Sequence, residues 1–233
     1  DEEDEIRKRL KELLDDVKRR LDELRRESER LLKEVDDLLR ESKKRLEDEK
    51  KKLEERGLSE EVKKVLKELE RVHDENLKLI RDWLEKHVRI NETLLKLIAE
   101  LLKILEDVMD ELTKDRTTKE RVERLLRTLE EVLKEVADRI RKLSKKDKED
   151  LDDILRRSKE SNERLREVIK RLAEKGVDKE VLERLEKIVR RNEEVNDEVR
   201  ELVTRLNETS NRAARELLEL AKRIIEEIKK AVK

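Results

Sequence analysis

Both histidines of the chain, His73 and His87, lie in one stretch, VHDENLKLIRDWLEKHVRIN, residues 72–91. His73 follows Glu70 at the Glu-x-x-His spacing of di-metal sites in helical bundles. Such a site needs a second copy of the motif and two further inward carboxylates, and the sequence has one copy. The 14-residue separation of the histidines places them about 20 Å apart on one helix, too far to share a metal or a haem. We therefore expect no metal site and no cofactor.

Serine, histidine and aspartate, the residue types of acid–base and nucleophilic catalysis, also occur together at one predicted level. Ser28 or Ser144 would lie there with His87 and Asp147. Catalysis further needs a cavity that admits substrate. With two glycines, no proline and no glycine-rich phosphate loop, the sequence offers no lid or cleft. We expect no enzyme.

The balance of charge argues against strong nucleic-acid or membrane binding. Charged residues make up 55% of the 233 residues, with 64 basic against 65 acidic side chains and a net charge of −1. No excess of positive charge is available to neutralise phosphates or anionic lipids. Cysteine is absent, no apolar run approaches the roughly 20 residues of a membrane span, and no signal-peptide pattern is present. We expect a soluble protein, cytoplasmic on recombinant expression.

Short breaks in the helical pattern predict where the helices end. LEERGLSEEV and LAEKGVDKEV each fit a helix stop followed at once by a helix start. A third break, in ELTKDRTTKERV, has no glycine and fits a capping box. The expected caps are the left-handed glycines Gly57 and Gly176 and the N-caps Ser59, Thr117 and Asp178.

These breaks predict four helices, over residues 3–56, 59–113, 118–175 and 178–232, each about 80 Å long. Apolar residues recur at a spacing near 3.5 and are often doubled, which is typical of the wide face of a bundle helix. The apolar stripe has a gap at Ser144–Asp150, so the third helix could be split in two there. The matched lengths of the other three helices favour a continuous helix. Equal lengths and short loops favour antiparallel neighbours. We expect an all-α fold, a single-chain up-down-up-down four-helix bundle over residues 1–233.

The two halves of the sequence are related. A shift of 119 residues, the separation of the two glycines, brings equivalent features into register. The shift superposes Leu53 on Leu172, Val62 on Val181, Leu69 on Ile188 and Ser42 on Ser161. This relation predicts two helical hairpins with approximate two-fold symmetry.

Polar residues interrupt the apolar stripes at core spacing. Antiparallel helices place at equal height residues whose numbers sum to a constant, about 116, 231 and 352 for the three loops. By this arithmetic the polar residues gather at two levels about 20 Å apart. The first level is predicted to hold Ser42, His73, Asn76, Ser158, Ser161, Asn192 and Asn196, and the second Ser28, His87, Asn91, Ser144, Asp147, Asn207 and Ser210. Because an unpaired buried polar group costs roughly 1 to 3 kcal/mol, we expect hydrogen-bonded layers that specify helix register and pairing.

Simpler interpretations stand beside this one. A histidine on a helix face is most often satisfied or partly exposed, and the tract RRNEEVNDEV could lie partly at the surface. Trp83, between the two levels, is most simply a core filler. Its indole N–H needs an acceptor, for which Asp147 or Thr204 lies near the right height.

Glu/Lys/Arg-saturated surfaces, Leu/Ile/Val cores, the loops GLSEE and GVDKE, and Ser, Asn and His at core positions occur together along the whole chain. This combination resembles computationally designed, parametric single-chain helical bundles with buried hydrogen-bond networks. The resemblance implies a structural scaffold with no natural biochemical function, and a monomer that requires no partner.

Other functions remain open. Such bundles also serve as interaction modules, either cages for a displaceable helix or halves of designed heterodimers. That alternative predicts a surplus apolar stripe or a weakened terminal helix, and it leaves self-association or a designed partner open. A third possibility is a pH-responsive bundle, in which protonation of His73 and His87 breaks the hydrogen bonds of the layers.

Overall fold

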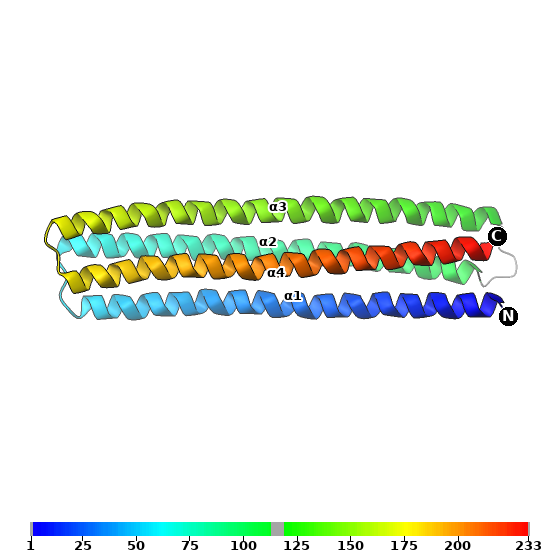
Figure 1. Cartoon of the computed structure of the whole chain (residues 1–233), viewed down its shortest axis with the longest axis horizontal. Coiled ribbons are helices and arrows are strands. Elements are labelled where there is room, and N and C mark those ends of the chain that lie inside the picture. Colours follow the sequence, from blue (N-terminus) through cyan, green and yellow to red (C-terminus); the bar gives the residue numbers. More distant parts are fainter. Residues whose placement is uncertain (1, 113–118, 233) are drawn as a thin grey trace. The chain divides into compact units, whose positions relative to one another are not determined.

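The computed structural model describes the backbone of residues 2–112 and 119–232. These residues form four helices, drawn in Figure 1: α1 (Glu2–Glu54), α2 (Glu60–Leu112), α3 (Lys119–Glu174) and α4 (Lys179–Val232). No strand occurs among them, so the predicted all-α class is confirmed. The observed helix ends lie within two residues of the predicted ones.

The gap in the apolar stripe of α3 does not interrupt the helix. The backbone is helical throughout Ser144–Asp150. Ser144 and Asp147 continue the alternating steps of four and three residues that lead from Ile140 to Leu151. The stripe is therefore polar here without being broken.

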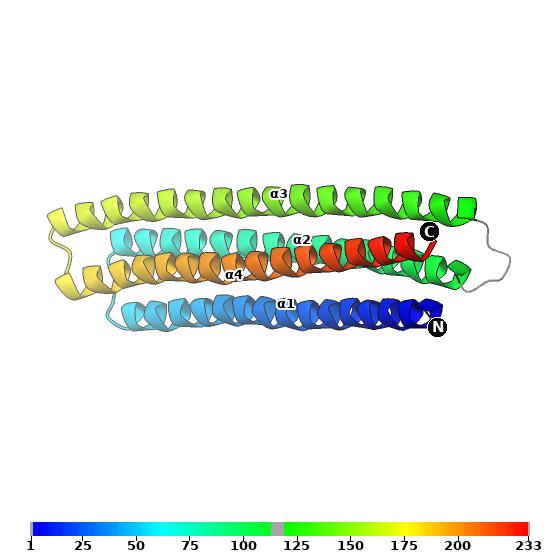
Figure 2. The same ribbon diagram turned by 45° about the vertical axis from the view of Figure 1, so that its right-hand side comes forward.

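The two glycine loops end their helices as the sequence predicts. Gly57 and Gly176 have φ angles of 72° and 82°, in the left-handed region. After α3 the amide of Val177 donates to Leu172 O (3.2 Å) and that of Gly176 to Ala173 O (3.1 Å). These two bonds form a Schellman motif, which satisfies carbonyls at the helix end. Both loops can be followed in Figure 2.

The residues after the glycines start the next helices. Ser59 Oγ accepts a hydrogen bond from the amide of Val62 at 3.4 Å, as an N-cap does. The carbonyl of Asp178 accepts from the amide of Leu182, the first bond of α4, while the Asp178 carboxylate lies 3.4 Å from Arg56 Nη1. The predicted cap Thr117 lies outside the described residues.

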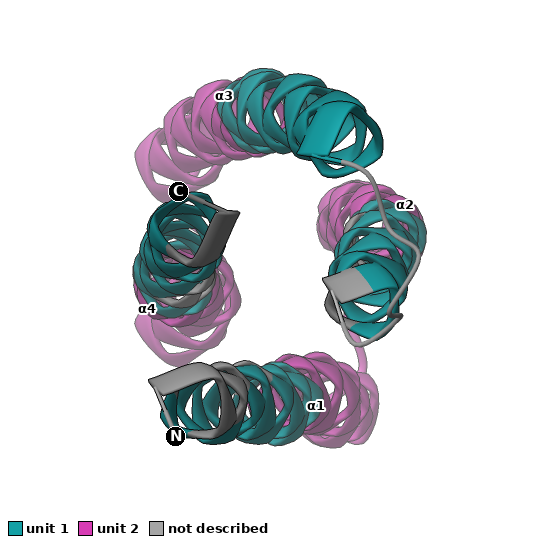
Figure 3. Cartoon of the chain, turned by 90° about the vertical axis from the view of Figure 1, so that its right-hand side faces the viewer, with its two compact units in different colours: residues 1–29, 87–146, 206–233 teal, residues 30–86, 147–205 magenta. Residues whose placement is uncertain are grey.

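Two compact units divide the chain, and each contains a segment of every helix (Figure 3). Unit 1 comprises residues 1–29, 87–146 and 206–233, and unit 2 comprises residues 30–86 and 147–205. The core of unit 1 draws on all four helices, with Leu21, Leu105, Leu129 and Ile224 among its buried members. A single bundle over residues 1–233 stays a prediction.

Unit 2 contains two apolar clusters. The loop-side cluster includes Leu53, Leu69, Leu172 and Leu185, and Leu58 and Val177 of the glycine loops pack against it. The second cluster lies further along the same helices and includes Val35, Ile80, Trp83, Leu155 and Val199. None of the helices, over the residues described, combines the length and apolar character needed to cross a membrane.

The left-handed glycine that follows α3 supplies a test of the loop. Gly176→Ala should lower the free energy of unfolding by about 1 kcal/mol, because a Cβ strains a residue with positive φ. Space is not the reason, since a Cβ built on Gly176 meets nothing within 4 Å. Urea unfolding measures the change. The control is Lys175→Ala, at an exposed neighbouring residue whose amide donates to Arg171 O as in an α-helix. Equal stability of the two variants would contradict the strain that we assign to a Cβ at Gly176.

Candidate functional site: a buried polar cluster

Seven Ser, His and Asn side chains interrupt the core of unit 2. On each helix they fall between residues of the loop-side cluster and residues of the second apolar cluster, or next to them. All seven are at most 8% exposed. We call them the polar cluster: Ser42 on α1, His73 and Asn76 on α2, Ser158 and Asn162 on α3, and Asn192 and Asn196 on α4.

Within the first hairpin, Ser42 meets His73. The Ser42 Oγ lies 2.8 Å from His73 Nε2, and the histidine tautomer decides which group donates. On the other side of the ring, Nδ1 is 3.7 Å from Asp74 Oδ1, beyond hydrogen-bond distance. The imidazole therefore has one side-chain hydrogen bond, which joins α1 to α2.

Asparagines join the remaining helices. Asn192 donates to Asn162 Oδ1 (2.8 Å) and Asn196 donates to Ser158 Oγ (2.6 Å), so α3 and α4 are linked twice. The Asn76 amide donates to Asn196 Oδ1 at 2.9 Å and also lies 3.3 Å from Asn192 Oδ1. Asn76 is thus the residue of this cluster whose hydrogen bonds link the first hairpin to the second.

One predicted member is replaced by its neighbour. Ser161 is half-buried and its Oγ accepts from exposed Arg164 at 3.2 Å, whereas Asn162 is 1% exposed and bonded to Asn192. The core of α3 follows alternating steps of four and three residues from Leu151 to Leu172, which include position 162 and pass over 161. The two-fold shift pointed to Ser161, and the helical spacing along α3 would have identified Asn162.

The polar cluster is not fully paired. His73 Nδ1, Asn76 Oδ1 and Asn162 Nδ2 are buried without a hydrogen-bond partner. Burial lowers the pKa of His73 below its ordinary value, because desolvation disfavours the charged imidazolium. The carboxylate of Asp74 opposes this shift, and the ammonium of Lys43 adds to it. His73 is therefore held in its neutral form.

The residues predicted for the second level are divided between the units. Ser28, Ser144 and Asn207 are half-buried in unit 1, where His87 is 3% exposed. Asp147 is also 3% exposed but belongs to unit 2. The side chains of Asn91 and Ser210 lie outside the described residues.

One hydrogen bond at the second level involves a residue absent from the prediction. Ser144 Oγ donates to Asn211 Oδ1 at 3.3 Å, across α3 and α4 of unit 1. Asn211, half-buried, follows the predicted Asn207 by four residues, one helical turn along the same face. Continuing the predicted polar positions by one turn would have found it.

Trp83 fills the core of unit 2, as expected, at 3% exposure. Its indole Nε1 donates to the backbone carbonyl of Asp147 at 2.9 Å, not to a side chain. Thr204, the other predicted acceptor, is exposed, whereas the buried indole donates to Asp147. Thr204 follows buried Val203 directly, and one step along a helix turns a side chain by about 100°.

One buried carboxylate, that of Glu49, is absent from the sequence prediction. Glu49 on α1 is 5% exposed, and its two oxygens lie 3.3 Å from Arg184 Nη1 and 3.2 Å from Lys187 Nζ on α4. Burial pushes the pKa of Glu49 up, but the bond to Lys187 and the surrounding cations outweigh it, so the pKa lies below its ordinary value. Glu49 continues the four-and-three spacing of Leu39, Ser42, Leu46 and Leu53, the signal that could have found it.

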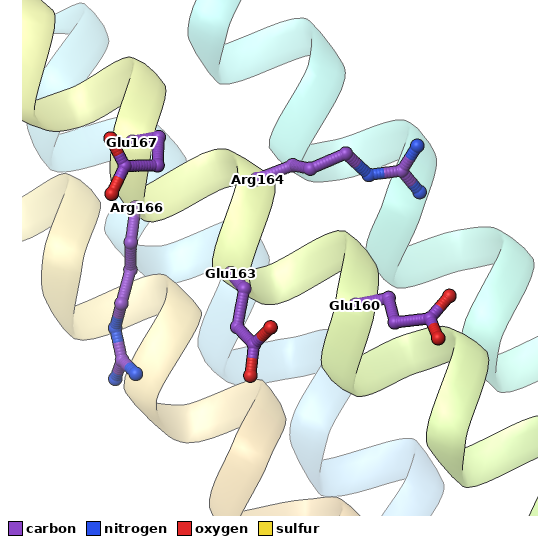
Figure 4. A pocket seen from close by; sticks show the side chains of 5 residues that line it. All are labelled: Glu160, Glu163, Arg164, Arg166 and Glu167. Atoms are coloured by element: carbon purple, nitrogen blue, oxygen red, sulfur yellow. The ribbon is translucent and has the colours of Figure 1, made fainter.

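Two further features of the described residues bear on chemistry, the grouping of possible metal ligands and a hollow on the surface of α3. Over the described residues, no three His, Cys, Asp or Glu side chains are grouped to hold a metal ion. A surface hollow on α3 is lined by charged residues of both signs: Glu160, Glu163, Arg164, Arg166 and Glu167. Figure 4 shows these side chains pointing in different directions from one helix, so their charged groups do not converge on a ligand.

Neutral His73 makes stability depend on pH. In the unfolded chain its pKa returns to about 6.5, so the unfolded state takes up the proton first. The stability contributed by neutral His73 is complete above pH 6.5 and is lost as pH falls below it. The free energy of unfolding, from urea titrations between pH 7 and pH 5, should therefore fall more for the wild type than for His73→Asn, which does not titrate. Parallel curves would contradict this prediction.

Glu49 gives a second test. Glu49→Ala leaves Arg184 and Lys187 without their buried partner and should lower the free energy of unfolding by about 2 kcal/mol. Glu41→Ala removes an exposed partner of Arg45 on the same helix and should change it by less than about 0.5 kcal/mol. Urea unfolding at pH 7 compares the two variants. Equal losses in the free energy of unfolding would show that the buried pairs of Glu49 stabilise the fold no more than an exposed pair does.

Comparisons of the chain with protein-family models, with curated proteins and with solved structures find no match.

Proposed function

We propose that the chain is a structural scaffold, a single-chain antiparallel four-helix bundle in which the polar cluster fixes the register of the helices and the pairing of the two hairpins. One observation carries the proposal. The buried amide of Asn76 on α2 reaches the side-chain oxygens of both Asn192 and Asn196 on α4. In this proposal the chain acts without a cofactor and catalyses no reaction.

Contacts within the units support antiparallel neighbours. Between α3 and α4 of unit 2, Ser158 pairs with Asn196 and Asn162 with Asn192, so the numbers rise on one helix as they fall on the other. Between α1 and α4 of unit 1, Arg9 pairs with Glu227 and Arg20 with Glu216 in the same opposed sense. Burial of the superposed pairs Leu53/Leu172, Val62/Val181 and Leu69/Ile188 supports the approximate two-fold relation between the hairpins.

The surroundings of Asn76 explain how it would select one register. One heptad from Asn192 along α4 lie Leu185 and Val199, and one heptad from Asn196 lie Val189 and Val203, all at most 2% exposed. A slide of seven residues would therefore set the amide of Asn76 against aliphatic side chains. Each polar group left unpaired costs roughly 1 to 3 kcal/mol, so the shifted packing is disfavoured.

The surface favours a scaffold over an interaction module. No large hydrophobic side chain is exposed among the described residues, whereas a module that captures a helix needs an apolar groove. The last turns of α4 are well anchored, since Ile224, Ile225 and Ile228 are at most 4% exposed. These features support a monomer that requires no partner, and with them the likeness to computationally designed bundles.

Replacing the linking asparagines by leucine separates specificity from stability. The variant with Asn76→Leu, Asn192→Leu and Asn196→Leu also carries Ser158→Ala and Asn162→Leu, because those two buried side chains would otherwise lose their partners. It should keep its helicity and its urea midpoint, because apolar side chains replace both members of each buried polar pair. It should lose its unique packing. We expect broadened or multiple amide signals in NMR spectra, or mixed oligomers in light scattering on a sizing column, where the wild type is a uniform monomer.

The matched control changes apolar residues of the same unit. Leu185→Ile with Ile188→Leu exchanges buried side chains of equal volume and should keep a single set of amide signals. A leucine variant that keeps one sharp set of signals and remains monomeric would contradict the proposed role of the asparagines.

A further inference from the structure

A small cavity adjoins the polar cluster. It is lined by Ser42, Arg45 and Leu46 of α1, His73 of α2, and Ile188, Arg191, Asn192 and Val195 of α4. The space in which the centre of a water molecule can move there is about 20 Å³. A water molecule itself fills roughly 10 to 15 Å³, so a cavity in which its centre can move has room for one.

The walls of this cavity offer the partners that a water molecule needs. A buried water makes two to four hydrogen bonds. The Ser42 hydroxyl, the His73 imidazole and the Asn192 amide line the space, and all three side chains are at most 7% exposed. One amide hydrogen of Asn192 is directed to Asn162, and the oxygen of Asn192 and the Ser42 hydroxyl can take further bonds.

The polar cluster also contains unused hydrogen-bonding capacity. Its own side chains leave His73 Nδ1 buried without a partner. An imidazole is ordinarily satisfied at both nitrogens when it is buried. His73 also lines the cavity, so a small molecule there that both donates and accepts would lie beside the imidazole that has this open nitrogen.

Unit 1 contains a second cavity that differs in its walls. It is lined only by apolar side chains, Ile98, Leu101, Leu102, Ile140, Ala214, Leu218 and Ala221, and the corresponding space is about 10 Å³. Apolar cavities of proteins stay dry, because a water inside them finds no hydrogen-bond partner. The two cavities differ in the polarity of their walls, so the chain itself provides the comparison.

We propose that the cavity beside Ser42, His73 and Asn192 is a hydration site, which binds one long-lived water molecule as part of the polar cluster, and that the apolar cavity of unit 1 binds none. The water completes hydrogen bonds that the seven side chains leave open. The site rests on the same facing polar side chains as the proposed scaffold function.

Oxygen-17 relaxation dispersion of the solvent counts long-lived buried waters without interference from exchanging hydroxyl protons. Val195→Ile adds a methylene group to the wall of the polar cavity and should lower the dispersion amplitude by the contribution of one water. Val203→Ile makes the same change on α4, at a buried position that does not line the cavity, and should leave the amplitude unchanged. Equal amplitudes for the wild type and Val195→Ile would overturn the proposal.

A measurement on the wild type guards against a variant that folds poorly. Water-selective NOE spectra should show cross-peaks from water to the carbon-bound ring protons of His73 and none to the methyl groups of Ile98, Ala214 or Leu218. Cross-peaks at both cavities, or at neither, would overturn the proposal. The NOE measurement uses the wild type and does not depend on the leucine variant of the scaffold test. A cavity without water would therefore refute the hydration site and leave the proposed scaffold function to its own test.

Discussion

A hydrophilic side chain enclosed by aliphatic ones must find a partner, and the arrangement of unit 2 depends on that requirement. The amide of Asn76 has its partners on another hairpin, at 2.9 and 3.3 Å. Leucine and valine contacts in the flanking clusters are interchangeable along a helix, because one aliphatic side chain packs much like the next. Hydrogen bonds are directional, so the asparagines distinguish positions that the apolar core treats as equivalent.

The helices and their ends could be predicted from spacing, glycine and capping residues, because these signals are local. The level of the polar residues also follows from arithmetic along antiparallel helices, as the Ser42–His73 and Asn76–Asn196 contacts illustrate. Which of two adjacent residues faces inward is harder to predict, because the two-fold shift indicates Ser161 whereas the helical spacing along α3 indicates Asn162. The burial of Glu49 could not be predicted from its residue type, because a charged side chain is normally exposed. The acceptor of Trp83 is a backbone carbonyl, which every residue has, so the sequence does not indicate it.

Charged residues serve two different purposes in this chain. Many pairs among the described residues, such as Arg45 with Glu41 and Arg40 with Asp36, are exposed and join residues one turn apart on the same helix. Such pairs contribute a few tenths of a kcal/mol to helix stability and say nothing about tertiary pairing. Glu49 differs because its partners lie on another helix and its carboxylate is buried. It adds an electrostatic link between α1 and α4 where the polar cluster has no bond.

The two tight glycine loops both lie in unit 2, and their position has a kinetic consequence. Closing a short loop costs little chain entropy, so local contacts form before distant ones. Ser42–His73 and the α3–α4 bonds each join helices connected by one such loop, and they can form while the two halves of the chain are still apart. The bonds of Asn76 to Asn192 and Asn196 can form only after the two halves have docked. Asn76 therefore stabilises correctly docked hairpins in the last step of folding.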